Sequence, residues 1–253
     1  MKEKPFEKIV ENGGFCGIFQ KIGCIGDSLL SGAFETTNKN GEPEFIDFPE
    51  YSWGKYIEKT LQNKVHVFAR GGMTAKEYCE SFAESKGFWD SKLACQAYII
   101  ALGANDLYWL NHEIGDISDI DIKGYKNNNK TITGYYGMII QRYKEIQPNA
   151  KFFLITLPLC EREDETKADR FTEIQYQIAD RINNVYILDF RKYAPNHDKA
   201  FREKYYLGNS HMNPMGYMLT ARYVMSYIDY IVRNNPQEFK QVGLIGTDYT
   251  FEE

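Results

Sequence analysis

Five short runs of apolar residues recur along the chain and predict five buried β-strands. The runs are rich in Ile, Val, Phe and Tyr, and they are nearly continuous rather than alternating with polar residues. Continuous apolar runs of this length are typical of strands that helices cover on both faces. The predicted strands comprise residues 21–25, 64–69, 97–102, 151–157 and 184–190.

Segments with apolar residues near helical spacing lie between and after these runs. Alternating strand and helix units predict a parallel sheet with right-handed crossovers, hence a fold of the α/β class. Two polar stretches, residues 31–50 and 108–130, are predicted to be loops at the side of the sheet where the strands end. The predicted helices comprise residues 51–62, 74–84, 131–147, 168–182 and 213–234.

The chain shows no internal repeat and no linker-like composition. Residues 1–253 are therefore expected to form a single domain, with a core at about residues 20–233. The composition of the tail, residues 236–253, allows two outcomes: the tail either wraps around the body or frays.

The net charge of −5 argues against a nucleic-acid partner, because such partners usually require a basic face. The N-terminus has scattered charges and no apolar run of the kind found in signal peptides, and no stretch approaches the ~20 apolar residues that span a bilayer. We therefore expect a cytoplasmic protein without a membrane partner.

Five cysteines without a CxxC pair indicate reduced thiols. No metal-ligand cluster, P-loop or GxGxxG motif is present, so we expect no metal and no cofactor.

Three motifs directly follow predicted strands, where ligands bind in parallel α/β sheets. The first contains Asp27 and Ser28 within Gly-Asp-Ser-Leu, and a serine at such a turn is either an exposed nucleophile or part of an ordinary helix cap. The second contains Gly72, whose N–H either faces an oxyanion or belongs to a flexible loop. The third contains Asn105 and Asp106: the Asn105 amide can donate to an oxyanion and Asp106 can brace the loop, although Asn-Asp is also common turn chemistry.

A fourth motif, Ser-His-Met-Asn-Pro, lies just before the last long helix. Its His211 is the candidate general base, folded back onto Ser28. The other three histidines, His66, His112 and His197, are assigned mainly to structural roles in a strand and two polar loops.

The order Ser28, Gly72, Asn105 and His211 resembles that of the SGNH hydrolase (GDSL-type esterase/lipase) family across about residues 20–233. The resemblance implies a three-layer α/β/α sandwich with a flavodoxin-like five-stranded parallel sheet of order 2-1-3-4-5. It also implies ester hydrolysis through an acyl-enzyme, with Ser28 as nucleophile and His211 as base. The oxyanion hole would comprise the N–H groups of Ser28 and Gly72 and the side chain of Asn105.

The chain departs from the family pattern at one position. Family members usually carry an Asp three residues before the histidine, where this chain has Gly208. The histidine could then be oriented by a backbone carbonyl in 207–209 or by another acid, with Asp189 the first candidate and Glu203 and Asp198 weaker ones. We expect backbone carbonyls to orient His211, with Asp189 not in direct contact.

The stretches 31–50 and 108–130 are rich in Tyr, Trp, Asn and acidic residues, which suits a polar substrate. The expected substrates are small acyl (acetyl-type) esters of sugars or other polar metabolites, and Trp109 either stacks on a sugar ring or packs in its loop. Two alternatives remain: an acyltransferase that uses the same Ser-His site, and a weakly active or non-catalytic carbohydrate-binding relative.

Overall fold

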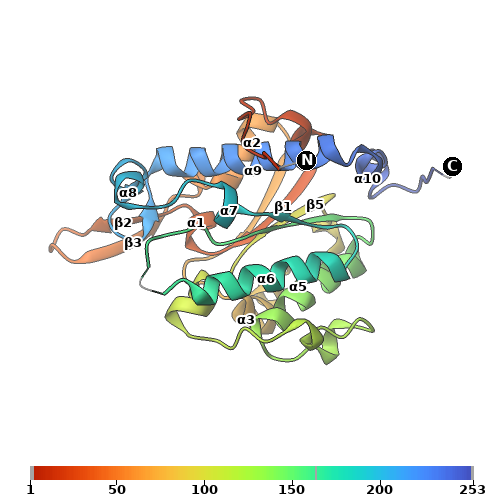
Figure 1. Cartoon of the computed structure of the whole chain (residues 1–253), viewed down its shortest axis with the longest axis horizontal. Coiled ribbons are helices and arrows are strands. Elements are labelled where there is room, and N and C mark those ends of the chain that lie inside the picture. Colours follow the sequence, from red (N-terminus) through yellow and green to blue (C-terminus); the bar gives the residue numbers. More distant parts are fainter. Residues whose placement is uncertain (1–2, 163, 252–253) are drawn as a thin grey trace.

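A computed structural model describes residues 3–162 and 164–251 of the chain. Its centre is a parallel sheet of five strands in the order β4-β1-β5-β6-β7 (Figure 1). Counted along the chain, these strands have the order 2-1-3-4-5, so the predicted topology is confirmed. The strands are β1 (Lys21–Gly26), β4 (Lys64–Ala69), β5 (Ala97–Ala101), β6 (Lys151–Ile155) and β7 (Val185–Leu188).

Helices cover both faces of this sheet (Figure 1). One face carries α2 (Trp53–Leu61) and α9 (Pro214–Asn234), whose apolar residues pack on alternate strand residues such as Cys24 and Ile99. The opposite face carries a second buried cluster, formed mainly by α5 (Ile132–Ile146), α6 (Thr166–Arg181) and the segment after β4. The α/β/α layering confirms the predicted fold class.

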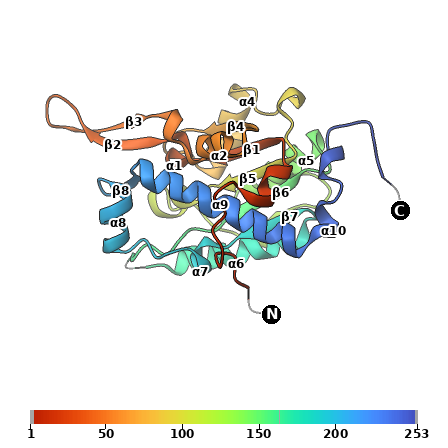
Figure 2. The same ribbon diagram turned by 90° about the horizontal axis from the view of Figure 1, so that it is seen from above.

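The segment 31–50, predicted as a loop, is instead a β-hairpin that extends from the body (Figure 2). Its strands β2 (Ala33–Thr37) and β3 (Pro43–Asp47) pair antiparallel, with Glu35 opposite Phe45. The Asn-Gly pair at residues 40–41, in the loop between the two strands, favours a hairpin. The prediction failed because the acidic and polar residues were interpreted as irregular loop.

The segment predicted as a helix at 74–84 is divided into α3 (Ala75–Glu77), a π-helical turn η3 (Tyr78–Phe82) and α4 (Ala83–Ser85). The stretch 108–130 begins inside a second π-helical turn, η5 (Asn105–Trp109). The remaining helices and short strands are η1 (Gly14–Ile18), α1 (Ser28–Ser31), η2 (Pro49–Tyr51), η4 (Ser91–Leu93), η6 (Ile117–Asp119), η7 (Tyr125–Asn127), α7 (Phe190–Tyr193), α8 (Lys199–Tyr205), β8 (Tyr206–Leu207), β9 (His211–Met212), α10 (Pro236–Phe239) and η8 (Val242–Leu244).

The C-terminal tail packs on the body as far as Ile245. Phe239 is buried, and its ring contacts those of Phe19 and Tyr186. Residues 252–253 of the predicted tail lie outside the described residues. Within the described part of the chain, no helix is both long enough and apolar enough to cross a membrane.

Candidate active site

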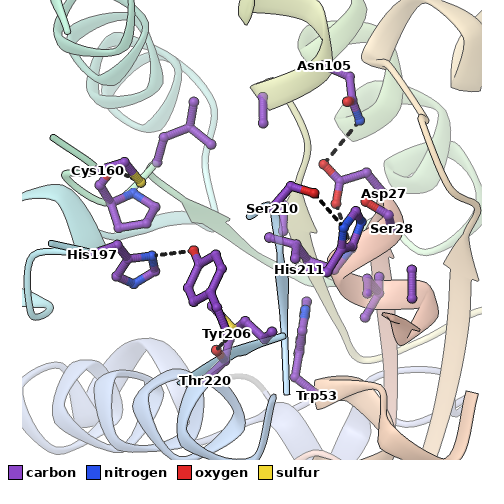
Figure 3. Close-up of a pocket in the computed structure, with 18 of the residues that line it drawn as sticks. Asp27, Ser28, Trp53, Asn105, Cys160, His197, Tyr206, Ser210, His211 and Thr220 are labelled. Carbon is purple, nitrogen blue, oxygen red and sulfur yellow. Dashed lines mark hydrogen bonds between the residues drawn. The ribbon is translucent and has the colours of Figure 1, made fainter. Parts of the chain in front are cut away.

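A cavity of about 1010 Å³ opens where the sheet strands end, and the four residues of the predicted site all line it. Figure 3 shows three of them, Ser28, Asn105 and His211. Ser28 is the first residue of α1, which follows β1 directly; Gly72 lies in the turn after β4, and Asn105 at the start of η5. His211 comes from β9, just before α9. Four segments that are distant in sequence therefore present these groups to one space.

Ser28 is the first residue of α1, and Asp27 caps this short helix by accepting a 3.0 Å hydrogen bond from the N–H of Leu29. The strand-to-helix turn is tight, since a Cβ at Gly26 would lie 2.8 Å from the Cβ of Leu30. The Ser28 side chain is half-buried and lines the cavity. Ser28 thus lies at the carboxyl end of the sheet and lines the space that a ligand would occupy.

The Asn105 amide is held by hydrogen bonds to two neighbouring segments. Its Nδ2 donates to the Met73 carbonyl at 3.0 Å and to Asp27 Oδ2 at 3.4 Å. The second contact is long, so this hydrogen can turn to a better acceptor in the cavity. Gly103, two residues earlier, has a φ of +115°, and a Cβ there would meet the Phe171 ring at 2.7 Å.

Asp106 is fully buried and joins the Asn105 segment to the segment that contains Gly72. Its carboxylate accepts the N–H of Ala75 at 3.0 and 3.2 Å and lies 3.2 Å from Nδ1 of His112. Asp106 therefore braces two of the three predicted oxyanion-hole segments, in line with its expected supporting position. His112 takes part in this brace and lies outside the cavity lining.

Asp27 is buried beneath the site, and burial raises its pKa to about 6. The nearby Asp106 carboxylate acts in the same direction, while the hydrogen bond from Leu29 opposes it. A carboxyl group in this position becomes neutral more readily than an exposed aspartate.

His211 is buried, and burial lowers its pKa although Glu35 and Asp47 nearby act in the opposite direction. Its Nδ1 lies 2.8 Å from the hydroxyl of Ser210 (Figure 3). That hydroxyl lies 3.1 Å from Oε2 of Glu35. The prediction that backbone carbonyls orient His211 is therefore wrong. A side-chain hydroxyl holds this position because the turn at 208–210 packs against the β2–β3 hairpin.

The candidate acids from elsewhere in the chain are engaged away from His211. Asp189 caps α7 and accepts hydrogen bonds from Thr156 and Tyr176. Asp198 caps α8, and Glu203 lies 4.0 Å from Lys199 on the surface. The expectation that Asp189 does not contact His211 agrees with these hydrogen bonds.

Sequence reasoning missed two residues near the site. Glu35 went unnoticed because its strand was interpreted as loop; the Asn-Gly turn signal of the hairpin could have revealed it. His197, assigned to a polar loop, is instead buried in the cavity wall with Nδ1 2.9 Å from the Tyr206 hydroxyl. Burial, together with Arg202 and Arg162, lowers the pKa of His197 to about 4, so this ring is neutral at pH 7.

A sequence model of the GDSL-like lipase/acylhydrolase family matches residues 24–219. The chain belongs to this family. As a family member it is a GDSL-type serine carboxylic ester hydrolase, which confirms the resemblance given by the sequence motifs. Comparison with curated proteins gave no match.

Solved structures of three esterases share the fold. A family two carbohydrate esterase from Clostridium thermocellum, in complex with cellohexaose, has 18% identity and a TM-score of 0.60; the match covers 87% of this chain and 65% of that chain. A carbohydrate acetylesterase from Sinorhizobium meliloti has 14% identity and a TM-score of 0.56; the match covers 84% of this chain and 99% of that chain. An acetyl xylan esterase from Butyrivibrio proteoclasticus has 15% identity and a TM-score of 0.53; the match covers 87% of this chain and 65% of that chain.

The site contains no arrangement typical of a metal centre: among residues 3–162 and 164–251, no group of three or more His, Cys, Asp or Glu is placed to hold a metal ion. All five cysteines are buried and unpaired. Cys160 lines the cavity, but burial raises the pKa of its thiol, which makes it a poor nucleophile.

Proposed function

We propose that the chain hydrolyses carboxylic esters through an acyl-enzyme on Ser28, with His211 as general base. The N–H groups of Ser28 and Gly72 and the side chain of Asn105 would form the oxyanion hole. The observation that supports this proposal is that all four residues line one cavity although they come from four separate segments. Such an arrangement supplies nucleophile, base and anion stabiliser together.

In the first half of the reaction, the Ser28 hydroxyl oxygen attacks the ester carbonyl carbon, and its proton passes to Nε2 of His211. The carbonyl oxygen becomes an oxyanion that accepts hydrogen bonds from the three donors. The bond to the alcohol oxygen then breaks, and His211 returns the proton to the leaving alcohol. In the second half, water attacks the acyl group in the same way and Ser28 regains its proton.

A general base must be neutral before it accepts a proton, and the burial of His211 favours that state. Burial lowers its pKa, so the imidazole is largely neutral at pH 7. We therefore expect kcat/KM to remain high at neutral pH. It should fall only when the pH drops below the usual pKa of histidine, because His211 then becomes protonated.

We propose small acyl esters of carbohydrates, or of similar polar alcohols, as substrates. The cavity of about 1010 Å³ is large enough for both an acetyl group and its alcohol. Trp109 lines this cavity, and the residue is 77% exposed, so its ring is free to stack on a sugar. Three structural neighbours are named as carbohydrate esterases, which supports the same class of substrate.

The proposal is tested with Ser28→Ala and a fluorophosphonate probe, which labels activated serines. We expect the wild-type chain to hydrolyse p-nitrophenyl acetate and acetylated xylo-oligosaccharides, with the label on Ser28. Ser28→Ala should not be labelled, and its kcat should be at least ~10³-fold lower than that of the wild type, because the nucleophile is absent. Ser31→Ala is the matched control, since Ser31 Oγ bonds Asp47 at 2.7 Å instead of facing a substrate.

Undiminished turnover in a folded Ser28→Ala variant would end the serine-hydrolase proposal. Turnover of p-nitrophenyl acetate without any release of acetate from the sugar ester would leave the mechanism in place and reject the carbohydrate substrate.

A further inference from the structure

Glu35 presents a carboxylate to the turn that precedes His211, although 176 positions separate the two residues in the sequence. Its Oε2 accepts hydrogen bonds from the backbone N–H of Asn209 at 2.8 Å and of Ser210 at 3.0 Å, and from the Ser210 hydroxyl at 3.1 Å. Three donors on a single oxygen fix the position of this side chain. The Glu35 carboxylate is thus held in one position beside His211 by hydrogen bonds, unlike a freely moving acid on the surface.

The same carboxylate explains why residue 208 is glycine. Gly208 has a φ of +79°, and a Cβ there would lie 2.4 Å from Cδ and 2.6 Å from Oε2 of Glu35. Those distances are far below any real contact, so a side chain at 208 and the present position of Glu35 exclude each other. Glu35 fills the space next to the position where the family usually carries its aspartate.

The hydrogen bonds also define which nitrogen of His211 carries a proton. Although burial raises the pKa of Glu35, hydrogen bonds from Asn209 and Ser210 outweigh burial and lower it, so the carboxylate is ionised and only accepts. The single Ser210 hydroxyl hydrogen therefore points to Glu35, and its oxygen accepts from His211. Nδ1 of His211 then carries the proton, which leaves the lone pair of Nε2 free to act as a base.

We propose that Glu35, through the Ser210 hydroxyl, is the positioning acid of this active site and takes the place of the family's aspartate. The relay holds the productive tautomer of His211. It also stabilises the positive charge that His211 acquires when it accepts the Ser28 proton; no proton needs to move along the relay. This inference rests on the proposed function of Ser28 and His211, since Glu35 itself touches no substrate.

Other charged groups surround His211, and they set the size of the expected effect. Asp47 on β3 also raises the pKa of His211. Arg202 on α8 faces the Asn209 carbonyl, at 3.5 Å, rather than the imidazole. Removal of Glu35 alone should therefore lower the pKa of His211 only in part, because Asp47 remains.

The test compares Glu35→Gln, Ser210→Ala and the double variant. Gln can still accept the two backbone hydrogen bonds but carries no charge, so the fold should survive. We expect kcat to fall about 10- to 100-fold, less than the ~10⁴-fold known for a directly bonded aspartate, with KM changed by about twofold or less. The double variant should be no worse than either single variant, because both break one relay. Glu44→Gln is the matched control: this glutamate lies on the same hairpin, is exposed, and should leave kcat unchanged.

The pH profile of kcat/KM separates this role from a structural one. Glu35 raises the pKa of His211, so its neutralisation should move the acid limb of the profile to lower pH. Unchanged kcat in Glu35→Gln overturns the proposal. A lower kcat with an unmoved acid limb overturns it as well, because the carboxylate would then only support the loop. If Ser28→Ala and His211→Ala abolish activity while Glu35→Gln does not, the relay alone fails and the proposed function stands.

Discussion

At the scale of single residues, the site depends on side chains that already make hydrogen bonds in the absence of substrate. The Asn105 amide is oriented by the Met73 carbonyl, and its second hydrogen makes only the long 3.4 Å contact with Asp27. A donor fixed in this way costs little reorganisation when an oxyanion forms, which is the property that makes preorganised donors effective.

Asn105→Ala is therefore expected to lower kcat by about 10²–10³-fold and to change KM much less, because the lost hydrogen bond acts mainly on the developing oxyanion. Steady-state kinetics with a short-chain p-nitrophenyl ester measure both parameters. Thermal unfolding of the variant verifies that the pocket is still folded. A rise in KM at unchanged kcat would show that Asn105 binds the ground state of the substrate instead.

The residues of the site were predictable from the sequence to different degrees. Ser28, Gly72 and Asn105 follow predicted strands directly, and the ends of parallel strands meet at one edge, so their convergence was expected. His211 needed the family pattern in addition, because nothing local places it near Ser28. The Asn-Gly signal could have indicated the strand that carries Glu35. The contact of Glu35 with residues 209–210 was not predictable, since it depends on how the hairpin packs against a turn that is distant in sequence.

At the scale of elements, long apolar patterns were predicted well and short polar ones poorly. The five central strands agree with their predicted ranges to within two residues at each end. The hairpin β2–β3 was missed because β3 is exposed along its whole length and so has no buried face to give an apolar alternation. The π-helical turns η3 and η5 were missed as well, since such turns differ from α-helix in hydrogen bonding rather than in composition.

The two hairpins β2–β3 and β8–β9 pack together at Gly208, and Gly208→Ala tests this contact. The new Cβ would lie 2.4 Å from Cδ of Glu35, so we expect the carboxylate to be displaced and kcat to fall about as much as in Glu35→Gln. Gly41→Ala, at the tip of β2–β3, is the matched control, because Gly41 has a similar φ of +82° with nothing within 4 Å of its Cβ position. Both variants carry the same backbone strain, of order 1 kcal/mol, and only Gly208→Ala adds a clash. Equal kinetics in the two variants would show that Glu35 adapts without loss.

At the scale of the whole molecule, the site and the C-terminal tail lie at opposite ends of the body. The β2–β3 hairpin and α8 lie at one end of the body and α10 at the other (Figures 1 and 2). Along the described chain, Tyr223 is the last residue that lines the cavity. The sequence left open whether the tail packs or frays, because residues 236–253 lack a clear periodic pattern. The outcome depends on one aromatic anchor, Phe239, which occupies a space between Phe19 and Tyr186.

Phe239→Ala should therefore destabilise the protein without affecting catalysis. Phe239 is 4% exposed, and the loss of a buried phenylalanine typically costs about 3–5 kcal/mol. The kcat and KM of the folded variant should equal those of the wild type, because the tail and the cavity lie at different ends of the molecule. Phe251→Ala is the matched control, since Phe251 belongs to the same tail but is 58% exposed, and we expect it to change the free energy of unfolding by less than about 0.5 kcal/mol. Urea unfolding measures both variants. Equal stability of the two would mean that the tail frays in solution, and a lower kcat in folded Phe239→Ala would mean that the tail contributes to the site after all.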